Sequence, residues 1–461
     1  MCPTDSGLEG SHRTLQSETG PLYQSASGTS TPIPLPEVYT KLAQREPGLD
    51  AKQVSTGVVW ATERAEEKGY RKEDPSWINF GQGAPESGPI PGCFDRPTSI
   101  PISEQSKEYG STAGIKKLRH AVAELYNNHY REGKESQYTY ENVCIVPGGR
   151  AGLIRIASIL QDCYLSFFFP DYTAYSEMLS LFKNFSPIPV PLDETDKYHI
   201  HLDIIKAELH RGVTALLTSN PRNPTGQCLR GNHLQELQDM CRKSCLLIMD
   251  EFYSRYNYTM GCDGSGISAA SNVIDVNEDH VLIIDGLTKA FRLPGWRVCW
   301  IVGPKSYIKA LSTAGSYLDG GCNVPFQEAA VSFLEPNLVK REMAALQVHF
   351  KTKRDYCIDR LQKMGFVFKY IPDFTFYIWL DLSPLPARIS TAMRFFQELL
   401  KEKTIVVPGF FFDLNPLARR EVFDSPMFKF VRLSYGPEMG SLVKGMDAIE
   451  RVINKHKKIE E

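Results

Sequence analysis

The sequence lacks long apolar runs, an excess of charge of either sign and any cysteine spacing typical of a zinc site. No segment reaches the roughly 20 consecutive apolar residues that a membrane helix requires. The first twenty residues have neither the basic stretch nor the apolar core of a signal peptide. The 52 basic and 54 acidic residues give a net charge of −2 without long single-sign blocks, which argues against a nucleic-acid partner. We therefore expect neither secretion nor membrane insertion.

The eleven cysteines include no CxxC pair, and only Cys241 and Cys245 lie close together in the sequence. Such scattered cysteines are typical of a reduced, cytoplasmic protein. His199 and His201 would share one face of a strand, but no third ligand lies near them in the sequence. We predict no metal site.

The composition changes along the chain and predicts its organisation. Residues 1–36 are rich in Ser, Thr, Gly and Pro, which indicates a flexible tail. We assign 37–80 to an N-terminal arm and part of a small domain, 81–315 to a large α/β domain and 316–461 to the rest of a small α+β domain. In the large domain, short apolar runs from "NVCIVPGG" to "RVCWIVG" alternate with helical periods, which predicts a mostly parallel sheet flanked by helices.

Three loops after predicted strands carry unusual polar groups, and strand ends of a parallel sheet meet at one edge. "TSNPRNPTGQC" holds Asn223 in a turn made rigid by proline and glycine. "LLIMDEFYSRY" ends an apolar strand on Asp250, which is either a helix cap or the partner of a buried cation. "IVPGGRAGL" places the amides of Gly149 and Arg150 at a helix start, where they could face an anion. Lys289, in "IIDGLTKAFRLPGWRVCWIVG", lies between two apolar runs that predict interior strands. A lysine in such a position at the edge of the sheet indicates a chemical role.

The order of these features resembles the class I and II aminotransferases of fold type I. The resemblance runs from about Trp77 to the C-terminal helix, and "NPTG" together with "TKAFRLPGWR" is highly specific. It implies a pyridoxal 5′-phosphate enzyme that acts on an amino acid and a keto acid. It further implies that the large domain binds the cofactor and that two copies form a homodimer with shared sites.

The resemblance implies a role around the cofactor ring for each of five residues. Lys289 corresponds to the Schiff-base lysine that also carries the proton of the reaction. Asp250 corresponds to the carboxylate that pairs with the pyridine nitrogen. Asn223 and Tyr253 correspond to the pair that binds the 3-oxygen of the ring, and Tyr172 to the aromatic side chain stacked on its face.

The resemblance also implies two anion sites. For the phosphate, it points to the amides of Gly149 and Arg150, to the Arg297 guanidinium, and to Tyr109 from the neighbouring subunit. For the substrate, it points to Arg432, in "KFVRLSYG", whose guanidinium would clamp the α-carboxylate. Gly83 would let the backbone close over that carboxylate, and Asn223 would also contact the substrate.

Departures from the family pattern bear on the substrate. Many members have a serine three residues before the lysine, where this chain has Gly286, so phosphate binding would depend more on Arg297. A glycine pair of the small domain appears here as Phe374 and Thr375, which should reshape the pocket. The segment "SYLDGGCNVPFQ" contains Asp319 but no arginine for a second substrate carboxylate. We therefore expect an aromatic or apolar amino acid, or a cationic one paired with Asp319.

Three functions remain open at this stage. An amino acid aminotransferase with a keto acid acceptor is the first. A lyase on the same scaffold, either a carbon–sulfur β-lyase or a relative of aminocyclopropane carboxylate synthase, is the second, because a fold does not decide the reaction. The third is a non-catalytic, regulatory aminotransferase-like protein, which the presence of Lys289, Asp250 and Arg432 disfavours. The sequence therefore predicts the aminotransferase.

Overall fold

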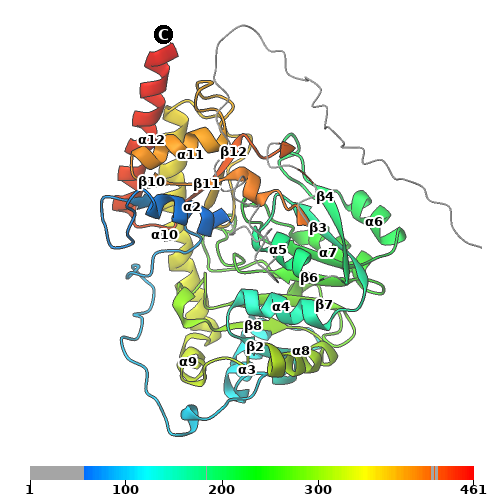
Figure 1. Cartoon of the computed structure of the whole chain (residues 1–461). Helices are drawn as coiled ribbons and strands as arrows, with labels where there is room; N and C mark the ends of the chain where they lie inside the picture. Colours follow the sequence, from blue (N-terminus) through cyan, green and yellow to red (C-terminus); the bar gives the residue numbers. More distant parts are fainter. Residues whose placement is uncertain (1–56, 183, 417–419, 421–423, 461) are drawn as a thin grey trace, which may run out of the picture. The chain divides into compact units, whose positions relative to one another are not determined.

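The segment between residues 143 and 302 forms one seven-stranded sheet in the computed structural model, which describes residues 57–182, 184–416, 420 and 424–460. Its strands lie in the order β2-β8-β7-β6-β5-β3-β4 (Figure 1). They are β2 (Val143–Val146), β3 (Cys163–Phe169), β4 (Phe185–Pro191), β5 (Val213–Ser219), β6 (Leu246–Asp250), β7 (Val281–Gly286) and β8 (Cys299–Val302).

The strands from β3 to β7 are parallel, and β8 runs antiparallel to its neighbours β7 and β2. The central strands β5, β6 and β7 are buried almost throughout, which explains their continuous apolar sequences. The predicted fold class, a mostly parallel sheet with flanking helices and a smaller α+β part, is confirmed.

The sequence pattern did not predict β4. Its sequence, FSPIPVP, contains three alternating prolines, which normally exclude an interior strand. The structure explains this exception because β4 is the edge strand and pairs only with β3. The proline nitrogens, which cannot donate hydrogen bonds, are tolerated at such an edge.

Helices flank the main sheet (Figure 1). For example, α4 packs on β7 and β8, while α8 packs on α4 and β2. The helices of this part are α3 (Lys116–Tyr130), α4 (Gly149–Ile159), α5 (Ala174–Leu181), α6 (Leu202–His210), α7 (Gly231–Cys241), α8 (Lys305–Leu318) and α9 (Val324–Ala330). Among the described residues, no helix combines the length and the apolar character needed to cross a membrane.

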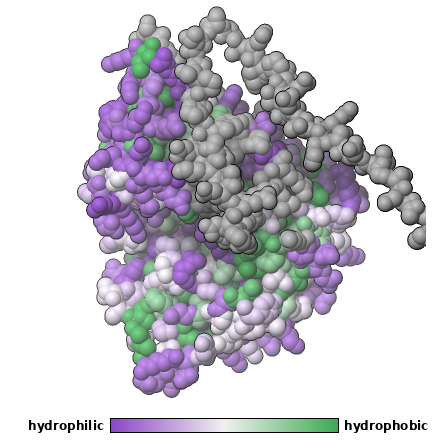
Figure 2. All heavy atoms as spheres, viewed as in Figure 1, coloured by the Kyte–Doolittle hydropathy of each residue, from purple (hydrophilic) through white to green (hydrophobic). Residues whose placement is uncertain are grey.

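Two small sheets and long helices form the rest. The strands β11 (Val407–Pro408), β12 (Phe430–Ser434) and β9 (Tyr377–Asp381) pair antiparallel, and β1 (Ile78–Asn79) pairs in parallel with β10 (Thr404–Ile405). The accompanying helices are α2 (Gly57–Glu66), α10 (Pro336–Lys363), α11 (Ala392–Lys401) and α12 (Met439–Glu460). The visible side of α12 is largely hydrophilic (Figure 2), because its apolar residues, such as Leu442 and Ile449, are buried.

The domain boundaries after residues 80 and 315 stay predictions. The main sheet lies within residues 143–302 and the three-stranded sheet within 377–434. The tail assigned to 1–36 and the first part of the arm, 37–56, lie outside the described residues.

Candidate active site

Lys289 lies in the turn that connects β7 to β8, at the end of the sheet where β5 and β6 also finish. The side chain is half-buried, and its Nζ donates a hydrogen bond to the Gly83 carbonyl. Burial, and then the charge of Arg432, lowers the pKa of Lys289 to about 8, while Asp250 opposes this shift. The neutral amine, which is the nucleophilic form, is therefore accessible near neutral pH.

Asp250 is the last residue of β6 and its side chain is buried. Its Oδ2 accepts a hydrogen bond from the Tyr175 hydroxyl at 2.7 Å. Burial raises the pKa of Asp250 to about 7, against the lowering effect of Tyr175. The next residue, Glu251, accepts a hydrogen bond from the Ala269 amide at 2.7 Å. A hydrogen bond from the Phe252 amide also lowers the pKa of Asp250, and a cation beside the carboxylate would stabilise its charged form further.

Tyr175 was absent from the residues predicted from sequence. It lies three residues after Tyr172, near the start of α5, and is fully buried. The rings of Tyr172 and Tyr175 meet edge to face, with centroids 5.4 Å apart. The second tyrosine of "PDYTAY" was the signal available in the sequence, because the turn that opens α5, closed by the Tyr175 amide on the Tyr172 carbonyl at 3.0 Å, brings residues three apart together.

Arg432 reaches the same region from β12 of the three-stranded sheet. Its Nη1 donates to Asn223 Oδ1 at 3.0 Å, and its Nη2 donates to the Gly81 carbonyl at 2.8 Å. The guanidinium is buried, and its Nε lacks a hydrogen-bond partner among the described residues. A buried donor without a partner is costly, so the site favours a ligand with acceptor oxygens.

Tyr253 and Tyr377 form a pair that sequence reasoning did not identify. Their hydroxyl oxygens lie 2.8 Å apart, and both side chains are buried. Tyr377 is in β9, two residues after Thr375, whose φ of 67° lies in the left-handed region. Glycine adopts that region at no steric cost, which fits the glycine pair that the resemblance led us to expect at Phe374 and Thr375. The substitution keeps the unusual backbone and leaves Tyr377 in the site.

The N-terminus of α4 and Arg297 meet at Gly148. Gly148 has a φ of 101°, and a Cβ added to it would lie 1.7 Å from Arg297 Nη2. The guanidinium therefore packs directly on the backbone that precedes Gly149 and Arg150. The Arg150 side chain donates from Nε to the Tyr172 hydroxyl at 3.1 Å. Backbone amides, a helix N-terminus and a guanidinium together suit a phosphate group.

Gly286, the departure from the family serine, has no room for a side chain. It pairs with Cys299 across β7 and β8, and a Cβ at Gly286 would lie 2.6 Å from the Cys299 Cα. The neighbouring hydroxyl of Thr288 lies 3.2 Å from Cys299 Sγ. The two strands therefore approach too closely for the serine of the family pattern.

Tyr109 does not join the other site residues within this chain. Its side chain is 99% exposed in a loop ahead of α3.

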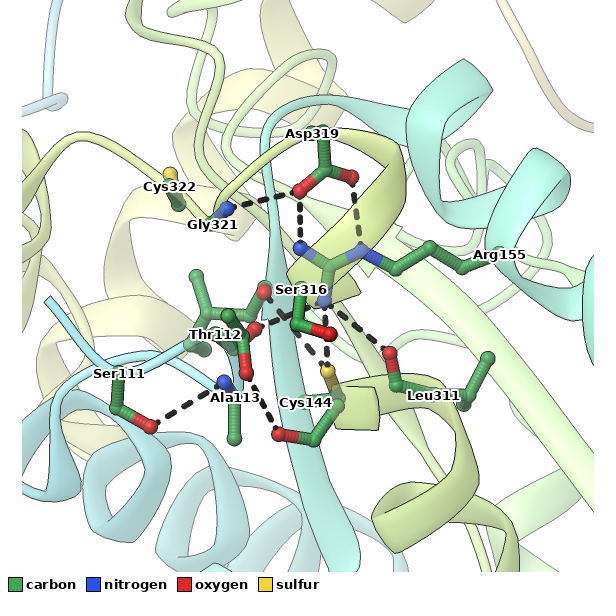
Figure 3. A network of polar contacts seen from close by, with 12 residues as sticks. Ser111, Thr112, Ala113, Cys144, Arg155, Leu311, Ser316, Asp319, Gly321 and Cys322 are labelled. Atoms are coloured by element: carbon green, nitrogen blue, oxygen red, sulfur yellow. Dashed lines mark hydrogen bonds and ion pairs between the residues drawn. The ribbon is translucent and has the colours of Figure 1, made fainter. Parts of the chain in front are cut away.

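Asp319 is not available to a substrate, because Arg155 on α4 holds its carboxylate through two nitrogens, with Nε donating to Oδ2 at 2.8 Å (Figure 3). The expectation that Asp319 could pair with a cationic substrate therefore loses its basis.

A buried network lies beneath the segment that carries Asn223. The Asn223 amide donates to Ser219 Oγ at 3.2 Å, and that hydroxyl donates to Asp171. Asp171 also accepts from the Tyr172 amide at 2.7 Å and is fully buried with Arg222, whose Nε lies 3.5 Å away. These contacts connect the loops of Asn223 and Tyr172, which fixes both against one another.

Solved structures share this fold. The aspartate aminotransferase of Thermus thermophilus with maleate aligns with a TM-score of 0.71 and 22% identity, covering 88% of this chain and 100% of that one. An aminotransferase from Mycobacterium tuberculosis aligns with a TM-score of 0.72 and 20% identity, covering 89% and 100% of the two chains. The fold is therefore that of an aminotransferase.

The family is shown by sequence as well. Residues 75–438 match the family "Aminotransferase class I and II", and the chain belongs to this family. A probable aspartate/prephenate aminotransferase of Aquifex aeolicus is 25% identical over 85% of this chain and 94% of its own. The aromatic-amino-acid aminotransferase 2 of Thermococcus litoralis is 26% identical over 82% and 92%. The predicted resemblance is confirmed, and the protein is an aminotransferase of a pyridoxal phosphate-dependent family.

The residues present fit that cofactor. Asp250 is a buried carboxyl whose charged form needs a cationic neighbour, as a protonated pyridine nitrogen would be. Gly148 leaves the space beside Arg297 free of side-chain atoms of its own, next to the first amides of α4. Lys289 supplies an amine with a lowered pKa. These groups would suit the nitrogen, the phosphate and the aldehyde of pyridoxal phosphate.

Proposed function

We propose that the protein transfers the amino group of an aromatic or apolar amino acid to a keto acid, with pyridoxal 5′-phosphate held by the residues described above. One observation carries the proposal. Lys289 Nζ and Arg432 Nη2 donate to carbonyl groups of the same short segment, those of Gly83 and Gly81. An amine that handles the Cα proton and a guanidinium that binds the α-carboxylate are thus directed at one place.

Each residue has a distinct task in this proposal. The bound cofactor supplies an electron sink that stabilises negative charge at the substrate Cα. Lys289 would bind the aldehyde and then move a proton to and from Cα. Asp250, ionised beside the pyridine nitrogen, would keep that nitrogen protonated. Asn223 and Tyr253 would bind the 3-oxygen, while Tyr172 would cover the ring face.

The two anions would be bound separately. The amides of Gly149 and Arg150 and the guanidinium of Arg297 would bind the phosphate. Arg432 would bind the substrate carboxylate, which would supply the partner that its Nε lacks among the described residues. Gly83 would close the backbone over that carboxylate.

The choice of substrate depends on which residues of the protein would contact the side chain of the amino acid. The segment 316–327 has no arginine, and its acidic residue Asp319 is bound to Arg155. A second substrate carboxylate would thus lack a cation from this segment. Tyr253 and Tyr377 add aromatic surface beside Arg432. Relatives of almost equal sequence identity are named aspartate/prephenate aminotransferase and aromatic-amino-acid aminotransferase, so their names do not distinguish the substrates. Our proposal of an aromatic or apolar substrate therefore depends on the residues above.

The exposure of Tyr109 supports a homodimer with shared sites. A fully exposed tyrosine is unusual, and Ile102, Tyr317 and Leu318 are also exposed apolar or aromatic residues. In a homodimer, Tyr109 of one copy would complete the phosphate site of the other. Sedimentation analysis of the protein and of a Tyr109→Phe variant, together with cofactor affinity, would test this arrangement.

A single-turnover experiment tests the reaction. Phenylalanine, added to the cofactor-loaded protein without a keto acid, should convert the cofactor to pyridoxamine phosphate and release one keto acid per site. A Lys289→Ala variant is the control and should release none. Continued formation of ammonia and pyruvate from a cysteine conjugate, with the aldehyde form of the cofactor persisting, would instead favour the β-lyase.

A further inference from the structure

Tyr377 touches both halves of the proposed site. Its ring lies 4.1 Å from Cζ of Arg432, the proposed carboxylate-binding group. Its hydroxyl lies 2.8 Å from the hydroxyl of Tyr253, the proposed partner of the cofactor oxygen. The side chain is completely buried, so both contacts form out of reach of solvent. Tyr377 is therefore placed to transmit a change from one group to the other.

The backbone holds Tyr377 in this position. In the pairing of β9 with β12, Trp379 lies opposite Arg432, and Tyr377 is two residues away on the same face of the strand. The Tyr377 amide donates to Thr375 Oγ1 at 3.1 Å. A Cβ added to Gly83 would lie 3.2 Å from the Tyr377 hydroxyl, so the segment above leaves that hydroxyl little room to move.

We propose that Tyr377 is a positioning residue that couples carboxylate binding at Arg432 to the strength of the hydrogen bond that Tyr253 donates to the cofactor. This inference rests on the proposed function, and it assigns to the same site a means of responding to its substrate. Either hydroxyl of the pair can donate to the other. When Tyr253 gives its proton to the 3-oxygen of the cofactor, Tyr377 is the donor to the Tyr253 oxygen, and without a carboxylate the Arg432 cation against the Tyr377 ring strengthens that bond. Tyr253 in turn donates strongly to the 3-oxygen of the cofactor.

A bound carboxylate would reverse this effect. It neutralises the Arg432 charge, so Tyr377 and then Tyr253 become weaker donors and the cofactor holds its own proton more tightly. Burial raises the pKa of Tyr377, while the charge of Arg432 lowers it. Within the described part of the chain, the titratable or charged groups that act on Tyr377 and Tyr253 include Arg432 from β12, Tyr172 from the segment before α5, and Tyr256. Arg432 alone among them is a cation.

The test is a pH titration of the absorbance of bound cofactor, made with and without saturating 3-phenylpropionate, a carboxylate that has no amino group. In the wild type, the carboxylate should raise the midpoint. In Tyr377→Phe, the midpoint without carboxylate should already be higher by about 0.5 to 1 pH unit, the equivalent of one hydrogen bond. The further rise on adding 3-phenylpropionate should be at most half that of the wild type.

A matched control is Tyr126→Phe. Tyr126 is also a buried tyrosine, and its hydroxyl accepts a hydrogen bond from Trp300 Nε1 at 3.3 Å, away from Arg432 and Tyr253. Its two midpoints should equal those of the wild type. If Tyr377→Phe does not fold, a difluorotyrosine at position 377, which keeps the shape but has a more acidic hydroxyl, should lower the midpoint without carboxylate.

Two different failures can be told apart. A wild-type protein that takes up no cofactor overturns the proposed function and this inference with it. A wild-type protein that binds cofactor normally, with Tyr377→Phe showing the same two midpoints, overturns the inference alone. The same conclusion follows if 3-phenylpropionate binds to the wild type without moving the midpoint.

Discussion

The lowered pKa of Lys289 can be measured without cofactor or substrate. At pH 7.5, an amine with a pKa of about 8 is neutral in about a quarter of the molecules, whereas an amine at 10.5 is neutral in about one in a thousand. Lys289 should therefore react with an amine reagent about 200-fold faster at this pH than an unshifted lysine of equal accessibility. The physical causes are burial first and the Arg432 charge second.

Trace labelling of the cofactor-free protein with acetic anhydride, followed by mass spectrometry of the Lys289 peptide, gives the fraction labelled against pH. Labelling of the exposed Lys72 corrects for loss of the reagent. The Lys289 curve should have its midpoint near pH 8.

Two variants separate the causes by sign. Arg432→Gln removes a cation that lowers the Lys289 pKa, so the midpoint should move up. Asp250→Asn removes an anion that raises this pKa, so the midpoint should move down. A wild-type midpoint above pH 10, or a shift of both variants in one direction, would refute the electrostatic reasoning.

Three further predictions concern other groups. Asp250→Ala should retain part of the cofactor but lower kcat by more than about 100-fold, because it removes charge stabilisation of the transition state; steady-state kinetics near those of the wild type would contradict this role. Arg432→Ala should lower kcat/KM by about 100-fold or more with cofactor affinity unchanged, whereas Arg297→Ala should mainly weaken cofactor binding in a fluorescence titration; identical behaviour would mean that the two anion sites are wrongly divided. Burial, and then Arg255, lowers the pKa of His129 from 6.5 to about 4. The contribution of His129 to the free energy of unfolding should therefore be fully present above pH 6.5 and be lost as the pH drops toward 4. His129→Gln should reduce the difference in Tm between pH 7 and pH 5, and an unchanged difference would exclude His129 as a cause.

The sequence predicted the main sheet because its strands are buried on both faces and their apolar runs are continuous. The strand β4 escaped prediction because its three prolines are acceptable only at an edge, and strand order is not visible in a local pattern. The antiparallel direction of β8 was likewise not evident, since an apolar run does not show the direction of a strand.

Candidate site residues could be predicted where a short motif holds them at a strand end, as for Asn223 and Lys289. Tyr377 could not, because its contacts with Tyr253 and Arg432 bring together residues that are more than fifty positions apart. The ion pair of Asp319 with Arg155 was missed for the same reason, and with it went the argument for a cationic substrate.

The close approach of β7 and β8 at Gly286 limits how this enzyme can change. A serine at position 286 would collide with the Cα of Cys299, an atom that no replacement of the Cys299 side chain removes. The serine that the resemblance led us to expect at this position is therefore not one substitution away in this chain. Laboratory evolution that selects for the serine should recover it only together with changes that move β8, so library designs limited to position 286 should yield no functional serine variant.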